Sequence, residues 1–462
     1  MVGAGSEAST VLLEFRAGNV RSFREDLHLS FVATRMGEPH VARTVPWREG
    51  GNPIQVLPCA GIFGPNASGK TNVLRAMHEM RSHVLSSFSK NRPEGGLPRH
   101  PFRFTSADLN SPTFFEVSIV LNGIRHDYGF SFDDDRILSE WAYRYPKGKL
   151  ATIFTREDDL SVKLGDIPKL EGRAVERLLR PNALFLSTAG QAKYEPLMAL
   201  YGWFRENLRI AEAMNRHNRT VFTAKLLKRP ERKKQLLALL QAADLGIVDV
   251  EELEPPPELV EQVRKAFQYA RSNLAGEGVL SIELVEDDDD EVDVAFGMMK
   301  LQLAHEGPSG EAVLFDLDDE SLGTQVWLGL VGPVIDALAD GSVLLADELD
   351  ASLHPALVEQ LVAMFQDPDT NPHNAQLVFN SFDPYLLGDS VGDRILGRDQ
   401  IWFTEKLENG ESRLYPLSSF SPRKQESVAR RYREGRYGAV PIVSHHGFAA
   451  AADLVTSTSC EK

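Results

Sequence analysis

Apolar and polar positions along the chain follow patterns that predict alternating strands and helices. The segment TVLLEFRAGNVRSF opens as a strand and turns at Gly18-Asn19, and residues 27–33 (LHLSFVA) alternate as a second strand does. Residues 56–64 (VLPCAGIFG) form an apolar run that enters a glycine-rich turn, whereas residues 71–85 carry apolar side chains at helical spacing. A buried strand followed directly by a helix is therefore expected around residue 64.

The predicted secondary structure changes twice in the middle of the chain. Residues 113–160 predict an antiparallel β-meander, because two alternating segments flank Asn122-Gly123, a dipeptide typical of a two-residue hairpin turn. Residues 165–275 contain amphipathic stretches of helical period, and residues 279–305 return to strand patterns. A mostly helical region therefore interrupts the strands.

The last third of the chain alternates between helix and strand. Helices are expected at residues 321–339 and 354–366, and strands at 342–347 and 376–380. This alternation predicts an α/β fold with a split head. The expected domains are residues 11–160, with an antiparallel β subdomain; 161–278, a mostly helical insertion; 279–443, the second part of the head; and 444–462, a disordered tail.

Composition bounds the class of protein. The 462 residues carry a formal net charge of −16, which argues against a surface that coats nucleic acid indiscriminately. The first ten residues lack the order of a signal peptide, no run of about 18 apolar residues predicts a membrane span, and Cys59 and Cys460 lie far apart. We expect a cytoplasmic protein without disulfides.

Charge is unevenly placed. Residues 205–234 contain ten Arg and Lys residues, and a second basic cluster lies between Arg423 and Arg436. Residues 286–291 are all acidic, which is typical of a solvated loop.

Residues 64–71 fit the phosphate-loop pattern G-x-x-x-x-G-K-[ST]. In this pattern backbone N–H groups surround phosphate oxygens, the lysine reaches the β- and γ-phosphates, and the Ser or Thr hydroxyl binds Mg²⁺. The following helix adds its positive N-terminal end. The predicted ATP-binding residues are Gly64, Pro65, Asn66, Ala67, Ser68, Gly69, Lys70 and Thr71.

The strand Val343–Ala346 delivers two adjacent acids, Asp347 and Glu348. We expect Asp347 to bind Mg²⁺ with Thr71, and Glu348 to polarise an attacking water, so that Glu348 and Lys70 are the predicted catalytic residues. The alternative is that the two carboxylates only cap the next helix, which is weak once the phosphate loop is accepted.

A third polar turn lies upstream, where Ser321, Gly323 and Thr324 open a helix. Gly323 precedes Asp347 by 24 residues. A Ser and a Gly at a helix start are the components of a second phosphate cradle. A serine N-cap followed by a turn glycine explains the same residues equally well.

Together, GPNASGKTN, ESLGTQ, VLLADELDASLHP and QLVFNSFD resemble the head of an ABC-type ATPase. This group includes SMC-like proteins, RecF-like proteins and the overcoming-lysogenisation-defect nucleases, with small standalone members classed as AAA-family ATPases. NVRSF (19–23) is similar to their N-terminal strand end, and residues 419–443 resemble the end of Rlo-type and abortive-infection ATPases, relatives of the ATPase in PARIS-type anti-phage pairs. The similarity extends over residues 11–443.

The resemblance implies a P-loop ATPase that uses ATP and Mg²⁺ in a composite site. Ser321, Gly323 and Thr324 would belong to the signature loop, which contacts the γ-phosphate held by a second copy, so ATP would form a homodimer or a higher oligomer. Residues 349–355 would be the D-loop at that interface. A glutamine-bearing loop is expected near residues 101–103, where no Gln stands.

Phe382 departs from the family pattern. It lies 35 residues after Asp347, where the resemblance implies a histidine beside the γ-phosphate. A phenyl ring cannot hydrogen-bond phosphate or water as imidazole does. Three interpretations remain: Glu348 suffices and hydrolysis is slow but real, which we favour; Asn380 or Ser381 substitutes; or ATP binding acts mainly as a switch.

Two classes of function compete. The first is a regulatory ATPase in anti-phage defence that controls a separate, nuclease-like effector, because fewer than 80 residues follow Asp383 and contain no nuclease-like acidic cluster. The second is a nucleic-acid-binding repair or maintenance ATPase that uses the basic segments. The chain lacks long heptad arms, which counts against an SMC-type tether. No membrane is expected as a partner. The helical region and the missing glutamine argue against a transporter ATPase.

Overall fold

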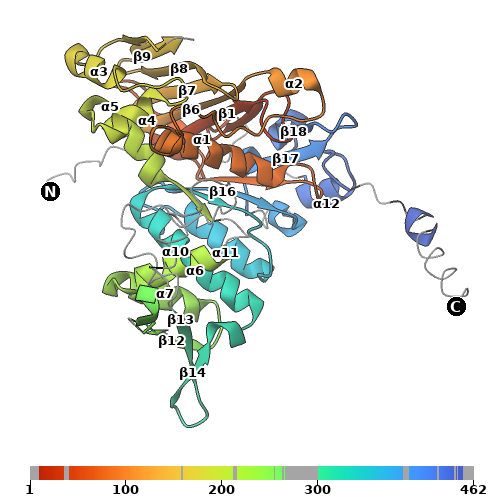
Figure 1. Ribbon diagram of the computed structural model, residues 1–462. Helices are drawn as coiled ribbons and strands as arrows, with labels where there is room; N and C mark the ends of the chain where they lie inside the picture. The colour runs from red at the N-terminus through yellow and green to blue at the C-terminus, as the bar shows by residue number, and fades with distance from the viewer. Residues whose placement is uncertain are drawn as a thin grey trace, which may run out of the picture.

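The structure is a computed structural model that describes residues 10–35, 41–157, 160–211, 216–253, 255–256, 258–262, 265, 300–388, 395–423, 426–441, 444 and 446–450. Two sheets dominate these residues, with helices between and below them (Figure 1). The acidic block at 286–291 and Cys460 lie outside the described residues, and the expected disordered tail contains a helical turn at 446–450.

The central sheet has six strands in the order β11-β15-β16-β5-β17-β18. The first five are parallel, and β18 pairs antiparallel with β17. Their bounds are Leu208–Ala211 (β11), Val343–Ala346 (β15), Gln376–Ser381 (β16), Cys59–Phe63 (β5), Ile401–Lys406 (β17) and Ser412–Pro416 (β18). Strands β5, β15 and β16 are buried along their whole length, as parallel strands covered on both faces are. The α/β prediction is confirmed.

Successive residues of these strands enter two different cores. In β5, Ala60 and Ile62 join one cluster of buried side chains, whereas Cys59 and Phe63 join the other. Helix α1 (Lys70–Lys90) packs on the first face, and α10 (Leu322–Asp340) and α11 (Pro355–Gln366) pack on the second. The sheet therefore lies between two helical layers. In such a fold a ligand binds at the carboxyl ends of the strands.

A seven-stranded sheet covers α1 from the other side, in the order β10-β9-β8-β7-β6-β1-β2. The meander predicted for residues 113–160 is confirmed, with Asn122 and Gly123 at positive φ of 50° and 76° in its first hairpin. The bounds are Val11–Gly18 (β1), Leu27–Ser30 (β2), Thr113–Leu121 (β6), Ile124–Phe132 (β7), Ile137–Arg144 (β8), Ala151–Glu157 (β9) and Val162–Leu164 (β10).

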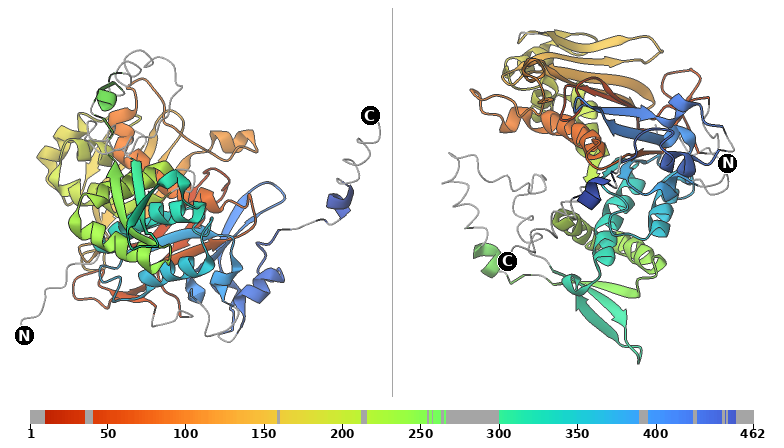
Figure 2. Two further views of the ribbon diagram at one scale, coloured as in Figure 1. Left: turned by 90° about the horizontal axis from the view of Figure 1, so that it is seen from below. Right: turned by 90° about the vertical axis from the view of Figure 1, so that its right-hand side faces the viewer.

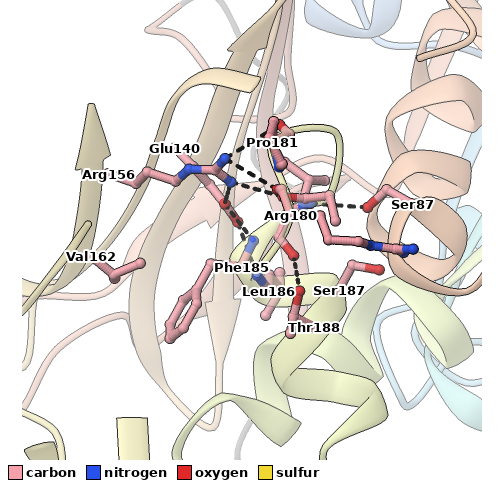
Figure 3. A network of polar contacts seen from close by, with 12 residues as sticks. Ser87, Glu140, Arg156, Val162, Arg180, Pro181, Phe185, Leu186, Ser187 and Thr188 are labelled. Carbon is pink, nitrogen blue, oxygen red and sulfur yellow. Dashed lines mark hydrogen bonds and ion pairs between the residues drawn. The ribbon is translucent and has the colours of Figure 1, made fainter. Parts of the chain in front are cut away.

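A buried acid ties this sheet to helix α4 (Phe185–Gln191). Glu140 of β8 accepts hydrogen bonds from the backbone N–H groups of Phe185 (2.6 Å) and Leu186 (3.0 Å), which are orphan donors at the helix start (Figure 3). Arg156 of β9 lies 3.9 Å from the same carboxylate and donates to the carbonyl of Ala183. Because both side chains are buried, this network fixes α4, which packs on α1, relative to the sheet.

The described part of residues 161–278 contains three strands besides the expected helices: β10, β11 and β12 (Ile247–Leu253). Helices α3 (Lys169–Glu176), α4 and α5 (Glu195–Gly202) are present, but β11 follows them and pairs in parallel with β15. This strand has only four residues and follows directly on the π-helix Trp203–Asn207, so its short apolar pattern merged with that of the preceding helices. The region therefore contributes a strand to the central sheet.

A second group of elements packs below α10, at the opposite end of the molecule from the seven-stranded sheet (Figures 1 and 2). It consists of α6 (Arg216–Leu227), α7 (Pro230–Ala242) and a sheet of β12 (Ile247–Leu253), β13 (Lys300–Glu306) and β14 (Ala312–Asp316). Among the described helices, only α10 has the length and apolar composition that could span a membrane, and 78% of that window is buried inside the fold.

The remaining elements are short. They are β3 (Arg43–Val45), β4 (Ile54–Val56), α2 (Ser106–Asn110), η2 (Leu317–Asp319), η3 (Pro384–Leu387), η4 (Arg398–Gln400), η5 (Leu417–Phe420) and α12 (Val428–Arg433).

Candidate nucleotide site

The phosphate loop connects β5 to α1 at the carboxyl edge of the central sheet. Gly69 is the N-cap of α1 with a φ of 108°, and Ala67 also has a positive φ of 61°. A Cβ atom on Gly64 would lie 2.3 Å from the backbone oxygen of Thr404, so only glycine fits between the loop and β17. The predicted strand–loop–helix arrangement is confirmed, and it turns the N-terminus of α1 toward the sheet edge.

Lys70 lies folded back over this loop. Its ammonium donates to the backbone oxygens of Gly64 (2.8 Å) and Pro65 (3.2 Å), and the residue is 5% exposed. Burial lowers the pKa of Lys70 to about 8, while the carboxylates of Asp350, Glu348 and Asp347 act in the opposite direction. An anion beside the ammonium would stabilise its charged form.

Thr71 and Asp347 meet at the edge of the sheet. The Thr71 hydroxyl donates to Oδ1 of Asp347 at 2.8 Å, although 276 residues separate them. Asn380, from the neighbouring strand β16, donates its side-chain amide to the same oxygen. The structure therefore brings together the hydroxyl and the carboxylate that the sequence predicts as magnesium ligands.

Asn380 also holds the second acid. Its side-chain oxygen accepts the backbone N–H of Glu348 at 2.6 Å, and Glu348 has a positive φ of 51°. This left-handed conformation is costly for a residue with a side chain. Glu348 is exposed, whereas Asp347 is buried, so the two adjacent acids face different surroundings. The interpretation as helix caps does not hold, because His354 is the N-cap of α11.

Phe382 lies over the lysine of the phosphate loop. Its ring centroid is 3.4 Å from the Lys70 ammonium, and the residue is 43% exposed. Its backbone N–H donates to Asp350 at 3.0 Å. Asn380 hydrogen-bonds both acids, and the Ser381 hydroxyl accepts the backbone N–H of Asp383.

The turn that begins at Ser321 lies beside Ser352. Ser321 is the N-cap of α10, and its hydroxyl accepts the backbone N–H of Thr324 at 3.2 Å, as the N-cap interpretation predicts. A Cβ atom on Gly323 would lie 2.9 Å from the backbone oxygen of Ser352. The candidate signature loop therefore packs against the candidate D-loop of the same chain, and this surface includes Leu322, which is 45% exposed.

The glutamine loop expected near residues 101–103 stays unassigned. Phe102 is buried there, and its backbone N–H donates to the side chain of Asn19. Strand β15, which precedes Asp347, pairs with β11, and β11 ends at Ala211. Residues 212–215, which continue it, lie outside the described residues.

These donors suit a nucleotide with Mg²⁺. Magnesium prefers a few protein oxygens and fills its shell with phosphate oxygens and water, and Thr71 and Asp347 supply two such oxygens beside the loop. Among the described residues, no group of three or more His, Cys, Asp or Glu side chains is placed to hold a metal. When bound, the ion would neutralise phosphate charge.

Several cations of the basic segment 205–234 pair with acids, most of them on neighbouring elements. The pairs join Arg205 to Glu206, Arg209 to Asp336 and Asp340, Arg232 to Asp336, Lys228 to Glu252, and Lys233 to Asp249. In the second cluster, Arg430 and Arg436 pair with Glu434, and Arg431 pairs with Glu426. These pairs leave less charge for nucleic acid than the sequence suggested.

Comparison with known proteins agrees with this geometry. A family model described as "AAA domain, putative AbiEii toxin, Type IV TA system" matches residues 59–388, which span the phosphate loop and both acids. No curated protein matches the chain.

Solved structures that match this chain include two SMC heads and a recombination mediator protein. A crystal structure of an SmcHead bound to the C-winged helix domain of ScpA is 11% identical with a TM-score of 0.42, covering 91% of this chain and 99% of that chain. The SMC head domain from Thermotoga maritima is 12% identical (TM-score 0.37; coverage 88% and 98%), and the recombination mediator protein RecF with ATP is 11% identical (TM-score 0.34; coverage 89% and 100%).

Proposed function

The chain belongs to the AAA-domain family whose description names an AbiEii toxin, and from this premise we propose that it is a Mg²⁺-dependent ATPase acting as a regulatory switch. The observation that carries the proposal is the meeting of Lys70, Thr71 and Asp347 at one sheet edge. Lys70 binds the β- and γ-phosphates, and Thr71 and Asp347 hold Mg²⁺. Glu348, exposed beside them, orients the attacking water.

Hydrolysis is slow in this proposal. Phe382 stands where a hydrogen-bonding side chain would assist the γ-phosphate, and its ring offers only a π-face to Lys70. The four polar groups of the site are intact, so the loss of one electrostatic contributor reduces the rate without abolishing it. A measurement of phosphate release by the native protein and by Glu348→Gln tests this, and equal rates in the two proteins would refute it.

We propose that ATP joins two copies of the chain. Ser321, Gly323 and Thr324 would complete the site of the partner copy, and the close approach of Gly323 to the backbone oxygen of Ser352 supports one continuous surface of signature loop and D-loop. Light scattering of Glu348→Gln with and without ATP tests this step. A dimer or higher oligomer that forms only with ATP is the expected result, and a monomer under both conditions would contradict it.

The oligomer would control a separate, nuclease-like effector protein in anti-phage defence in the cytoplasm. The family match supports this setting, because its description names a toxin of a type IV toxin–antitoxin system. Nucleic acid is the competing partner, and the ion pairs of the basic segments disfavour it. DNA binding whose affinity falls steeply with salt would favour the repair function instead.

A further inference from the structure

We infer that the free edge of β14 is a docking site for an extended, basic segment of a partner protein, which adds a strand to the sheet of β12, β13 and β14. The edge would serve the separate partner of the proposed function, and in this the inference rests on that function. Among the described residues β14 is the last strand of its sheet, and the β13–β14 hairpin projects from the end of the molecule opposite the seven-stranded sheet (Figures 1 and 2). An edge of this kind offers a row of backbone donors and acceptors to another chain.

The side chains of β14 are apolar and exposed on both faces of the strand. Val313, Leu314 and Phe315 are between 36% and 42% exposed, although successive side chains of a strand point to opposite faces. Residues 312–315 include no charge and no proline, and their pairing with β13 runs without a bulge. Charges, prolines and bulges are the devices that keep natural edges from pairing with other chains. Their absence from this strand indicates an edge that is open to pairing.

The hairpin geometry shows which backbone groups of β14 point outward. The N–H of Gly307 donates to the carbonyl of Glu311 at 2.7 Å, and the pairs then alternate along the two strands. In an antiparallel ladder every second residue turns its N–H and C=O toward the neighbouring strand, and the residues between turn theirs away. Val313 therefore bonds to β13, whereas Ala312 and Leu314 present their N–H and C=O groups to the free edge.

The surroundings of β14 are acidic, which defines the chemistry of the partner. Residues 306–320 contain no Lys or Arg and six acids, which are Glu306, Glu311, Asp316, Asp318, Asp319 and Glu320. Within the part of the chain that the structure describes, none of the six forms an ion pair with Lys or Arg, and Glu320 pairs with His305 at 2.7 Å. Lysine or arginine side chains that flank an apolar strand would therefore complement both ends of this edge.

A second copy of the chain is a poorer occupant because of the same charges. Antiparallel pairing of two β14 strands about their centre would bring Glu311 of one copy beside Asp316 and Asp318 of the other. Parallel pairing in register would set identical acids opposite one another. Like charges across a strand pair are destabilising, and each whole chain carries a net charge of −16. The charges therefore favour a basic partner over self-association.

A partner on this edge would lie close to the candidate signature loop. Strand β14 continues through η2 to Ser321, the N-cap of α10. His305 of β13 also hydrogen-bonds Glu320, the residue before Ser321, at 2.7 Å. The docking edge and the candidate signature loop are therefore joined by one short segment of chain.

The test is the binding of a fluorescent peptide to the full chain without nucleotide, measured by fluorescence anisotropy. The probe is KKITVTIKK, in which lysines flank an alternating apolar strand, and the control peptides are EEITVTIEE and KKGSGSGKK. We expect KKITVTIKK to bind with a Kd of about 0.1 mM, which weakens as salt is added. The control peptides lack either the positive charge or the apolar strand and should not bind.

Ala312→Pro separates strand addition from general attraction to an acidic protein. It removes one outward N–H while the bonds to β13 remain, so the affinity for KKITVTIKK should fall by about tenfold. Ala312→Ser is the matched control, because it keeps this N–H and should bind as the native protein does. Leu314→Lys provides a second test, since a lysine on the edge repels the basic probe and blocks pairing.

Equal affinity of the native protein and Ala312→Pro, or no binding of KKITVTIKK by the native protein, would overturn the inference. A nucleotide-free dimer that Ala312→Pro abolishes, without peptide binding, would also overturn it and assign the edge to a second copy. ATP hydrolysis by the same preparations separates this failure from that of the proposed function. Turnover without peptide binding removes the docking edge alone, whereas peptide binding by a protein that neither binds nor hydrolyses ATP removes the proposed function.

Discussion

Asn380 donates its side-chain amide to the carboxylate of Asp347, across two adjacent parallel strands. Its side-chain oxygen also accepts the backbone N–H of Glu348 at 2.6 Å, so one residue of β16 fixes both acids that follow β15. The Thr71 hydroxyl donates to the same carboxylate, so hydrogen bonds join the N-terminus of α1 to the ends of β15 and β16. The geometry of the candidate site therefore depends on Asn380, a residue outside the predicted set of phosphate and metal ligands.

Asn380→Ala should impair both stability and catalysis. It leaves the backbone N–H of Glu348 without its acceptor and removes one of the two donors to Oδ1 of Asp347, at a cost of about 1–3 kcal/mol in the free energy of unfolding, and we expect kcat to fall by about tenfold. Urea denaturation and steady-state kinetics measure the two effects. Asn371→Ala is the control: Asn371 is equally buried and hydrogen-bonded to Phe365 and Ala375, away from the site, so it should lower stability alone. A similar loss of kcat in both variants would refute a positioning role.

ATP affinity should depend on pH through Lys70. Its pKa of about 8 in the free protein lies below the ordinary value, and bound phosphate raises it. Binding is therefore strongest below about pH 8 and weakens as the pH rises further, by up to about tenfold per pH unit. Phosphate is already ionised above about pH 7, so titrations between pH 7.5 and 9 isolate the lysine. Lys70→Arg, which stays protonated, should lose this dependence; a slope retained in the arginine variant would contradict the assignment.

Gly69→Ala should abolish nucleotide binding. Its φ of 108° is unfavourable for alanine, and a Cβ atom would lie 2.5 Å from Oγ of Ser412 and 2.9 Å from Oγ of Ser22. The loop must shift to relieve this contact, which removes its N–H groups from the phosphate position. Gly123→Ala is a matched control, because Gly123 also has a positive φ but has no atom within 4 Å of its Cβ position. Fluorescent-nucleotide titration should show loss of binding in the first variant only.

Glu140→Ala should destabilise the protein without touching the nucleotide site. It removes the acceptor of two backbone N–H groups at the start of α4 and of the Tyr128 hydroxyl, and leaves Arg156 buried beside no carboxylate. We expect a loss of about 3–5 kcal/mol in the free energy of unfolding, since an uncompensated buried charge remains. Denaturant unfolding measures this loss. An effect below about 1 kcal/mol would show that water or neighbouring carbonyls satisfy Arg156.

Much of the fold could be predicted because its signals are local. The phosphate loop, the meander and the strands at residues 342–347 and 376–380 each carry a continuous apolar or turn pattern. The strand β11 was missed because it has four residues and its identity depends on pairing with β15, far away in sequence. The glutamine loop stays unassigned, because no Gln stands near residues 101–103.

The sequence indicates which residues form the candidate site but not how they contact one another. Lys70, Thr71, Asp347 and Glu348 follow from motifs, and the structure brings them together. The sequence raised Asn380 only as a substitute for histidine, because no motif shows that its amide bridges two acids. That Phe382 covers Lys70 depends on the geometry of the turn after β16, which residue type alone does not define.

Steady-state ATP hydrolysis by the native protein, beside Glu348→Gln and Phe382→His, tests the central claim most directly. The account predicts slow, Mg²⁺-dependent turnover by the native protein, none by Glu348→Gln although it still binds ATP, and faster turnover by Phe382→His. Native protein that binds ATP without turnover, while Phe382→His hydrolyses it, would contradict the claim of a working ATPase and leave an ATP-bound switch.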